Sequence, residues 1–170
     1  MNGHPGGEAH TRRMLAMAGL PRGARVLDLG AGAGETLALL RGLGFRAEGL
    51  DLSPRSPLVD KGDLLRTPYP DGSFDGVLSQ CAFFASGDVP GALREAHRLL
   101  RPGGKLLLSD VFFQAPEALL NGAGFSLLRA EDMTAAWREY ILEALWREDV
   151  PCRTIPRGRC GYWLLIGERR

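Results

Sequence analysis

The sequence has little that would tie the protein to a membrane, a nucleic acid or an oxidising compartment. Its 170 residues contain no apolar run near the roughly 18 residues that a membrane-spanning helix needs. The 21 basic and 20 acidic residues nearly cancel, leaving a net charge of +1 and no basic footprint for nucleic acid. Only three cysteines occur, and the first ten residues carry no apolar signal region. These absences favour a cytoplasmic protein that binds neither a membrane nor a nucleic acid.

Short apolar segments alternate with helical segments along the chain. The alternation predicts one domain over residues 1–170, with a disordered leader at 1–7. Interior segments such as VLDL and KLLL are apolar throughout, as burial on both faces of a sheet requires. The pattern therefore predicts an α/β, doubly wound, Rossmann-like and mostly parallel sheet. Strands are expected at 25–29, 46–50, 74–79, 105–109, 125–129 and 162–166, and helices at 8–19, 35–43, 90–100, 116–123 and 132–146.

The strand RVLDL runs into the glycine loop GAGAG at residues 30–34, and a helix follows it. Glycines allow a sharp turn and a close approach to a ligand, and the helix start offers free N–H groups. No GK[ST] follows, so the loop is not a P-loop. The spacing G-x-G-x-x-G is also missing, because Glu35 stands three residues after Gly32, which disfavours a nicotinamide dehydrogenase. Asp28 would repel a pyrophosphate, whereas it can hold an ammonium group.

A second acid, Asp51, ends the next expected strand, 17 residues after Gly34. A carboxylate in this place can accept hydrogen bonds from both hydroxyls of a ribose. The ligand should therefore carry a ribose near Asp51 and a positively charged amino-acid group near Asp28. S-adenosylmethionine has both groups.

Four ordered stretches resemble class I S-adenosylmethionine-dependent methyltransferases, especially the group of quinone-biosynthesis and small-molecule enzymes. They are RVLDLGAGAGETL, AEGLDLS, GDLLRTPYPDGSFDGVLSQCAF and ALREAHRLLRPGGKLLLSD, and together they cover residues 24–111. The resemblance implies a methyl donor, S-adenosyl-L-methionine, whose product is S-adenosyl-L-homocysteine, and a small-molecule acceptor. It also implies six to seven strands in the order 3-2-1-4-5-7-6, with the last strand antiparallel.

The same resemblance assigns the cofactor-binding residues. The glycine loop and Asp28 would line the methionine part, whereas Asp51 and Leu52 would hold the ribose and one edge of the adenine. Residues 63–64 would meet the adenine amino group, and residues 80–81 would face the sulfonium. The full set is Asp28, Gly30, Ala31, Gly32, Gly34, Asp51, Leu52, Asp63, Leu64, Gln80 and Cys81.

The chain departs from the family between its second and third strands. Only 11 residues, 52–62, separate Asp51 from Asp63, and they include the segment SPRSP. A helical crossover needs roughly 10–12 residues before its strand is counted. We therefore expect the helix to be lost and the third strand to be very short, near 58–60, or absent. An exposed sheet edge of this kind can pair with a second chain, so a homodimer is one expectation.

Methyl transfer from a sulfonium needs mainly proximity and alignment, and a base only if the nucleophile must lose a proton. Two weak candidates for a catalytic role end expected strands, Asp110 and Cys81. Asp110 would act as a base or hold the substrate, but a turn or capping residue is the favoured explanation for it. No metal site is expected. Four phenylalanines follow the same two strands and form either an apolar wall for the substrate or core under the loops: Phe83, Phe84, Phe112 and Phe113. Trp146, at the end of the last helix, is expected in the core that covers the sheet.

Two alternatives stay open. A degenerate domain that binds the cofactor or a partner without turnover is favoured by the lost helix and disfavoured by the intact Asp28, glycine loop and Asp51. The segment around Cys81 also resembles arsenite methyltransferases, in which a cysteine there binds trivalent arsenic. Cys152 and Cys160 would have to join it, yet their C-x7-C spacing is no standard metal signature, and small apolar cysteines explain them more simply.

Overall fold

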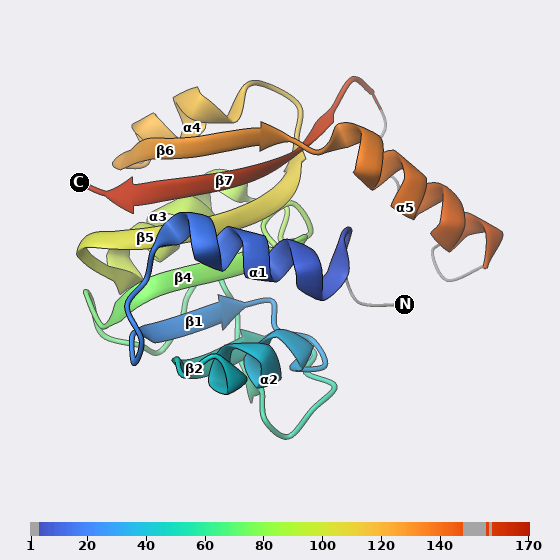
Figure 1. Ribbon diagram of the computed structural model, residues 1–170. Coiled ribbons are helices and arrows are strands. Elements are labelled where there is room, and N and C mark those ends of the chain that lie inside the picture. The colour runs from blue at the N-terminus through green and yellow to red at the C-terminus, as the bar shows by residue number, and fades with distance from the viewer. Residues whose placement is uncertain (1–3, 148–155, 157) are drawn as a thin grey trace.

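A single twisted sheet runs through the computed structural model, which describes residues 4–147, 156 and 158–170 (Figure 1). The strands follow the order β3-β2-β1-β4-β5-β7-β6. β1 to β5 pair in parallel, and β7 runs antiparallel to both β5 and β6. The order and direction predicted from the family resemblance are confirmed. The bounds are β1 (Arg25–Leu29), β2 (Arg46–Asp51), β3 (Asp60–Lys61), β4 (Phe74–Gln80), β5 (Leu100–Phe112), β6 (Phe125–Asp132) and β7 (Gly161–Arg169).

Helices cover both faces of the sheet, which gives three layers. Figure 1 shows α1 and α2 on the near face and α3 on the far face. One buried cluster joins Met14 of α1 and Leu37 of α2 to the near face, and another joins Leu93 of α3 and Leu120 of α4 to the far face. Apolar strands buried on both sides are thus the physical reason for the doubly wound fold. The helices are α1 (Gly7–Ala18), α2 (Glu35–Gly42), α3 (Val89–Leu99), α4 (Pro116–Gly122) and α5 (Thr134–Trp146).

The segment 52–59 between β2 and β3 has no helix, as the 11 residues between Asp51 and Asp63 predict. β3 is two residues long and pairs only through Asp60 with Leu50 and Lys61 with Asp51. Both β3 residues are exposed and charged, and a short charged edge resists pairing with another chain. Pairing of two chains along this edge remains a prediction.

The end of α5 corrects an expectation. Trp137 is buried and its ring stacks on Tyr162, with centroids 6.3 Å apart, but Trp146 is 88% exposed rather than part of the core. The 13-residue helix is roughly 20 Å long and extends beyond the sheet, so its last turns have nothing to cover (Figure 1). Its start also differs from the prediction: Asp132 ends β6, and Met133 is the N-cap without a side-chain cap bond. The Asp132 carboxylate accepts a hydrogen bond from the Thr134 N–H at 2.9 Å, which forms a turn just before the helix.

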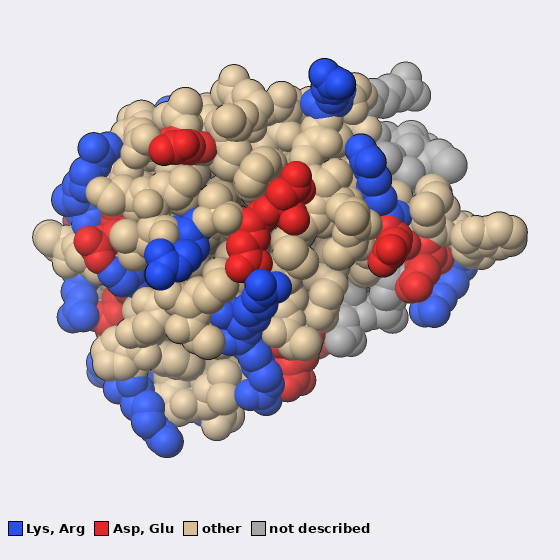
Figure 2. Space-filling model, turned by 45° about the horizontal axis from the view of Figure 1, so that its top comes forward, with Lys and Arg blue, Asp and Glu red and all other residues tan. Residues whose placement is uncertain are grey.

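The charges on the surface are mixed. Figure 2 shows basic and acidic side chains interspersed on the face that it presents, without a large area of one sign. This distribution agrees with the near balance of charges in the sequence. In the described part of the chain, no helix has the length and apolar content needed to cross a bilayer.

Candidate functional site

Two neighbouring cavities lie at the carboxyl ends of β1, β2 and β4, where open α/β sheets bind ligands. The larger, of about 440 Å³, is bordered by Asp51, Asp63 and Cys81, and the smaller, of about 200 Å³, by Asp28. Four residues border both cavities, so the two are halves of one cleft: Gly30, Gly32, Arg55 and Gln80. The structure brings together ten of the eleven residues expected to bind the cofactor: Asp28, Gly30, Ala31, Gly32, Asp51, Leu52, Asp63, Leu64, Gln80 and Cys81.

Gly34 is the expected residue that borders neither cavity. It is the N-cap of α2 with a φ of +79°, a left-handed conformation that favours glycine. A Cβ there would lie 3.3 Å from Cγ2 of Val59. Gly34 therefore packs the loop against segment 52–62 and starts α2.

The glycine loop closely contacts Ala82 and the end of β2 at Gly30. Its φ is +86°, and a Cβ on it would lie 2.3 Å from the Cβ of Ala82. The Gly30 N–H donates to the carbonyl of Leu50 at 2.8 Å, which fixes the loop to the end of β2. Only glycine fits here, and the loop borders both cavities through Gly30 and Gly32.

Asp51 ties the loop to the carboxyl end of β2. Its Oδ2 accepts a hydrogen bond from the Gly32 N–H at 2.9 Å, and its Oδ1 accepts one from the Ser53 N–H at 2.8 Å. A carboxylate offers about four acceptor positions, so roughly two remain for a ligand. Beside it, Leu52 is 67% exposed, which places an apolar surface at the rim of the larger cavity.

Asp28 lies deep in the smaller cavity and is 3% exposed. Burial, and to a lesser degree the charge of Asp51, raises its pKa to about 7. A cation entering this cavity would favour the ionised carboxylate. Asp28 is therefore suited to an ammonium group, as the sequence predicts.

Arg55 is a site residue that the sequence did not reveal. Its backbone N–H donates to the carbonyl of Gly32 at 2.9 Å. Its Nη2 lies 3.3 Å from the place that a Cβ on Gly32 would occupy, so the guanidinium lies over the glycine loop. A single arginine in the segment SPRSP has no periodic or motif context, and only the folded chain places it between the two cavities.

The start of α1 covers the end of β4. A ring nitrogen of His4 lies 3.2 Å from the Gln80 amide nitrogen, and the Thr11 hydroxyl donates to the Gln80 side-chain oxygen at 3.2 Å. Burial lowers the pKa of His4, so its ring is neutral at pH 7. The leader expected to be disordered thus includes a residue that borders the smaller cavity, and residues 1–3 lie outside the described part.

Cys81 has a strained backbone and a protonated thiol. Its φ is +61°, which non-glycine residues rarely adopt, and its Sγ lies 3.2 Å from the Tyr162 hydroxyl. That hydroxyl also donates to Oγ of Ser109 at 3.0 Å. Burial, followed by the charge of Asp110, raises the pKa of the thiol to about 12. A neutral thiol is a poor nucleophile and a poor metalloid ligand.

Asp110, the other catalytic candidate, borders neither cavity of the cleft. Its Oδ2 accepts from the Phe84 N–H at 3.1 Å, and its Oδ1 accepts from the Val111 N–H at 2.7 Å. Burial raises its pKa to about 6, although these backbone donors oppose the shift. In this arrangement Asp110 holds the loop after β4, and a catalytic role for it remains a prediction.

The described part of the structure does not group the cysteines as binding of trivalent arsenic would require. Cys81 and Cys160 are free thiols that pack against the same buried residues, Tyr162 among them. Cys152 lies outside the described residues. Within the described ranges, no three histidine, cysteine or acidic side chains are grouped to hold a metal ion.

The four phenylalanines divide between the two roles expected for them. Phe83 and Phe112 are buried in the core. Phe84 is half-buried, and Phe113 is 52% exposed, with their ring centroids 5.8 Å apart. Phe113 is the most exposed of the four and is therefore the one most open to contact with a ligand.

The fold and cleft define a Rossmann-like α/β domain with a ligand site at the point where strand order reverses, between β1 and β4. A profile of the methyltransferase domain family matches residues 27–108. The chain is 31% identical to the 27-O-demethylrifamycin SV methyltransferase of Amycolatopsis mediterranei over 193 aligned positions, covering 95% of this chain and 69% of that protein. It therefore belongs to the class I S-adenosylmethionine-dependent methyltransferase family.

Other relatives agree with this membership. The demethylmenaquinone methyltransferase of Tropheryma whipplei is 33% identical over 119 residues, which cover 61% of this chain and 48% of that protein. The chain thus spans about half the length of such curated relatives. A Haemonchus contortus phosphoethanolamine N-methyltransferase, solved with S-adenosyl-L-methionine, has the same fold, with a TM-score of 0.74 and 18% identity over 98% of this chain and 53% of that one.

Proposed function

We propose that this chain binds S-adenosylmethionine in the cleft and transfers its methyl group to a small-molecule acceptor by in-line displacement. The observation that supports this most is the placement of Asp28 and Asp51 on either side of one glycine loop, in two cavities that share a border. The donor set fits the cofactor, because the larger cavity offers carboxylate acceptors for a ribose and the smaller one offers a buried acid for an ammonium group.

The nucleoside half would occupy the larger cavity. Asp51 would accept hydrogen bonds from the ribose hydroxyls, and Leu52 and Leu64 would contact the adenine ring. Asp63 uses its Oδ1 to accept from the Leu65 N–H at 2.8 Å, which leaves Oδ2 for the adenine amino group. The short segment 52–62 borders this side of the cleft through Leu52 and Arg55.

The amino-acid half is a zwitterion and would occupy the smaller cavity. Asp28 would hold its ammonium group, and Arg55, which lies over the loop between the two cavities, would hold its carboxylate. An arginine pairs with a carboxylate through two parallel hydrogen bonds when the geometry allows. The ammonium group and the carboxylate of the ligand would thus each face a protein side chain of the opposite charge.

Arg55→Ala is expected to remove the preference for a cofactor that carries a carboxylate. We expect S-adenosylmethionine to bind about five- to tenfold more weakly, since one charge-assisted interaction is lost. The decarboxylated form of S-adenosylmethionine should bind the variant and the original chain alike, as measured by calorimetry. Arg66→Ala is the matched control, because Arg66 is exposed and borders neither cavity. Equal weakening of both ligands would assign Arg55 to the nucleoside instead.

When bound, the cofactor supplies a methyl group activated by a positively charged sulfur. The work of the chain is to align that group with the acceptor and to keep water away. Gln80 and Cys81 border the larger cavity at the end of β4, and the bond from the Cys81 N–H to the Ser109 carbonyl, at 2.9 Å, fixes this turn. The cleft residues thus act by position, and no general base is assigned.

The transfer is tested with S-adenosylmethionine that carries a labelled methyl group. The purified chain is incubated with a panel of phenols, amines and carboxylic acids, and S-adenosylhomocysteine and labelled product are measured together. Labelled product in an amount equal to the S-adenosylhomocysteine formed would support the proposal. Tight binding of the cofactor without product across the panel would favour a binding domain without turnover. The missing helix between β2 and β3 is the feature that favours this alternative.

A further inference from the structure

A third cavity, of about 730 Å³, opens at the carboxyl end of β5 and is separate from the two cavities of the cleft. It lies between the end of β5, the start of β7 and the first turn of α5. Its volume is in the range of small-molecule sites, roughly 300–1,000 Å³. The binding of the cofactor as proposed uses none of its residues.

The charge in this third cavity is predominantly positive. Two arginines border it, Arg138 and Arg159, against one acid, Asp132. Hydrogen bonding to Thr134, and to a lesser degree the charge of Arg138, lowers the pKa of Asp132, so this carboxylate is ionised and partly balances Arg138. Within the described residues, neither arginine forms an ion pair. Two cations without fixed partners are suited to an anionic ligand.

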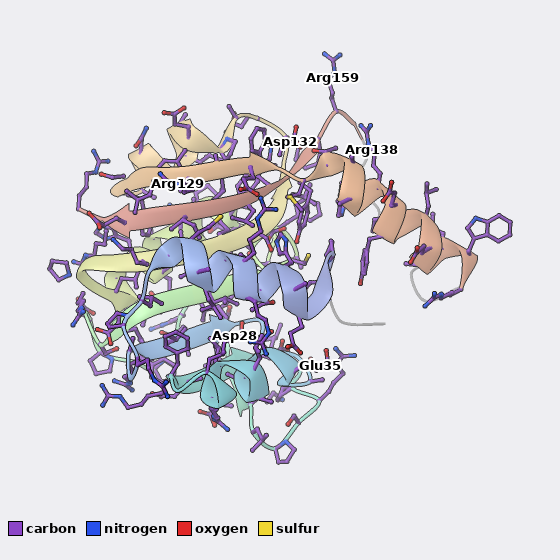
Figure 3. All side chains as sticks on the ribbon, in the orientation of Figure 1. Asp28, Glu35, Arg129, Asp132, Arg138 and Arg159 are labelled. Carbon is purple, nitrogen blue, oxygen red and sulfur yellow. The ribbon has the colours of Figure 1, made fainter. Side chains whose placement is uncertain are left out.

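The arginines gather at one end of the molecule. Figure 3 shows Asp132 and Arg138 near the start of α5 and Arg159 on the neighbouring loop before β7, with its side chain directed outward, whereas Asp28 and Glu35 lie apart from them, beside α1 and α2. The first turn of α5 also borders the cavity through Thr134 and Ala135. A helix N-terminus adds a partial positive charge to that of the guanidinium groups.

Aromatic side chains form the other wall. Phe113 and Trp163 border the cavity, and Phe113 keeps 52% of its surface exposed. The Phe113 ring contacts that of Phe84, three residues after Cys81, which borders the larger cavity of the cleft. Phe84 is on the loop 81–86, which borders the larger cavity through Cys81, Ala85 and Ser86. The aromatic pair therefore packs the wall of this cavity against a loop that borders the cleft.

We propose that the third cavity takes the methyl acceptor, and that the acceptor is an aromatic carboxylate. Its ring lies against Phe113 and Trp163, and its carboxylate pairs with Arg138 and Arg159. The assignment of this ligand as the methyl acceptor rests on the proposed function. The cavity and its positive charge do not depend on it. A cationic acceptor would be repelled by the two arginines.

The test uses 1-naphthoate and its neutral analogue, 1-naphthalenemethanol, as probes of the protein saturated with S-adenosylhomocysteine. We expect Arg138→Ala and Arg159→Ala each to weaken naphthoate binding about five- to tenfold and to leave the neutral probe within about twofold. Arg129→Ala is the matched control, because Arg129 is on β6 and borders none of the three cavities (Figure 3). It should change neither affinity.

Three results would overturn the proposal. They are no naphthoate binding at millimolar concentration, equal weakening of both probes, or no effect of either arginine. Titration of the same variants with S-adenosylhomocysteine separates this failure from failure of the proposed function, since the cofactor should bind all three variants normally. Transfer is then compared between hydroxybenzoates and their methyl esters. In this step the phenolic oxygen bonds to the methyl carbon as the sulfur–methyl bond breaks, S-adenosylhomocysteine leaves, and the phenolic proton passes to the solvent. A preference for the acids that Arg138→Ala removes would support the acceptor assignment, and an equal rate with both would contradict it.

Discussion

Replacing Asp51 with alanine is expected to weaken the binding of S-adenosylhomocysteine by on the order of 100-fold or more. Two losses combine. The carboxylate can no longer accept hydrogen bonds from the ribose, and the Gly32 N–H, which donates to Oδ2 at 2.9 Å, loses its partner. The glycine loop, which borders both cavities, then loosens at the same time. Calorimetry on the original chain and the variant, at one pH and salt concentration, measures the difference.

A second variant separates the two losses. Asp51→Asn keeps one oxygen acceptor and removes the charge, so we expect an intermediate loss, about tenfold. Asp60→Ala is the matched control, because Asp60 is an exposed acid on the neighbouring β3 and borders neither cavity. Unchanged affinity in Asp51→Ala, with the fold intact by circular dichroism, would contradict the placement of the ribose beside Asp51.

The sequence predicted those parts of the site that depend on neighbours along the chain. Asp28 and the glycine loop follow directly from β1, and Asp51 ends β2, so their order alone brings them to one edge of a parallel sheet. The count of residues between Asp51 and Asp63 likewise predicted the missing helix. These signals are local in the sequence. The doubly wound fold contributes one further condition, that the carboxyl ends of adjacent parallel strands lie at the same edge of the sheet.

The parts that could not be predicted depend on contacts between distant segments. Arg55 lies over Gly32, and His4 contacts Gln80 across 76 positions of the chain. Trp146 has the apolar character of a core residue, yet α5 leaves the sheet before reaching it. In each case the residue type is compatible with several environments, and only packing selects one.

Asp28→Asn is expected to stabilise the free protein while it weakens cofactor binding. The folded pKa of Asp28, about 7, lies above the unfolded value of 3.8. Between these two pH values the folded state binds more protons, so this carboxyl lowers the free energy of unfolding as the pH rises through that window, after which the effect levels off. An asparagine has no charge to bury. Its amide still needs partners, so we expect a net gain of about 1–3 kcal/mol at pH 8 and little change near pH 4.

Urea unfolding at pH 4.5 and pH 8 measures this gain, with the exposed Asp60→Asn as the control that should show neither. A gain equal at the two pH values would mean that burial of the charge is not its cause. A loss at pH 8 would mean that the native carboxylate is stabilised by the fold, and the raised pKa of Asp28 would be wrong.

Cofactor binding should show the opposite trend, because the ligand needs the ionised form that the empty fold disfavours. The ammonium group of S-adenosylhomocysteine would pair with the Asp28 carboxylate, so affinity should rise as the pH passes through about 7. Binding should release most of a proton per ligand at pH 6 and little at pH 8, measured by calorimetry in buffers of different ionisation enthalpy. Asp28→Asn should bind about tenfold more weakly at pH 8 and release no proton from this site.

A stable variant with weaker binding and no proton release would show that the chain keeps a buried acid at a cost in stability because the ligand requires it. Proton release unchanged in the variant would assign the titrating group to another residue.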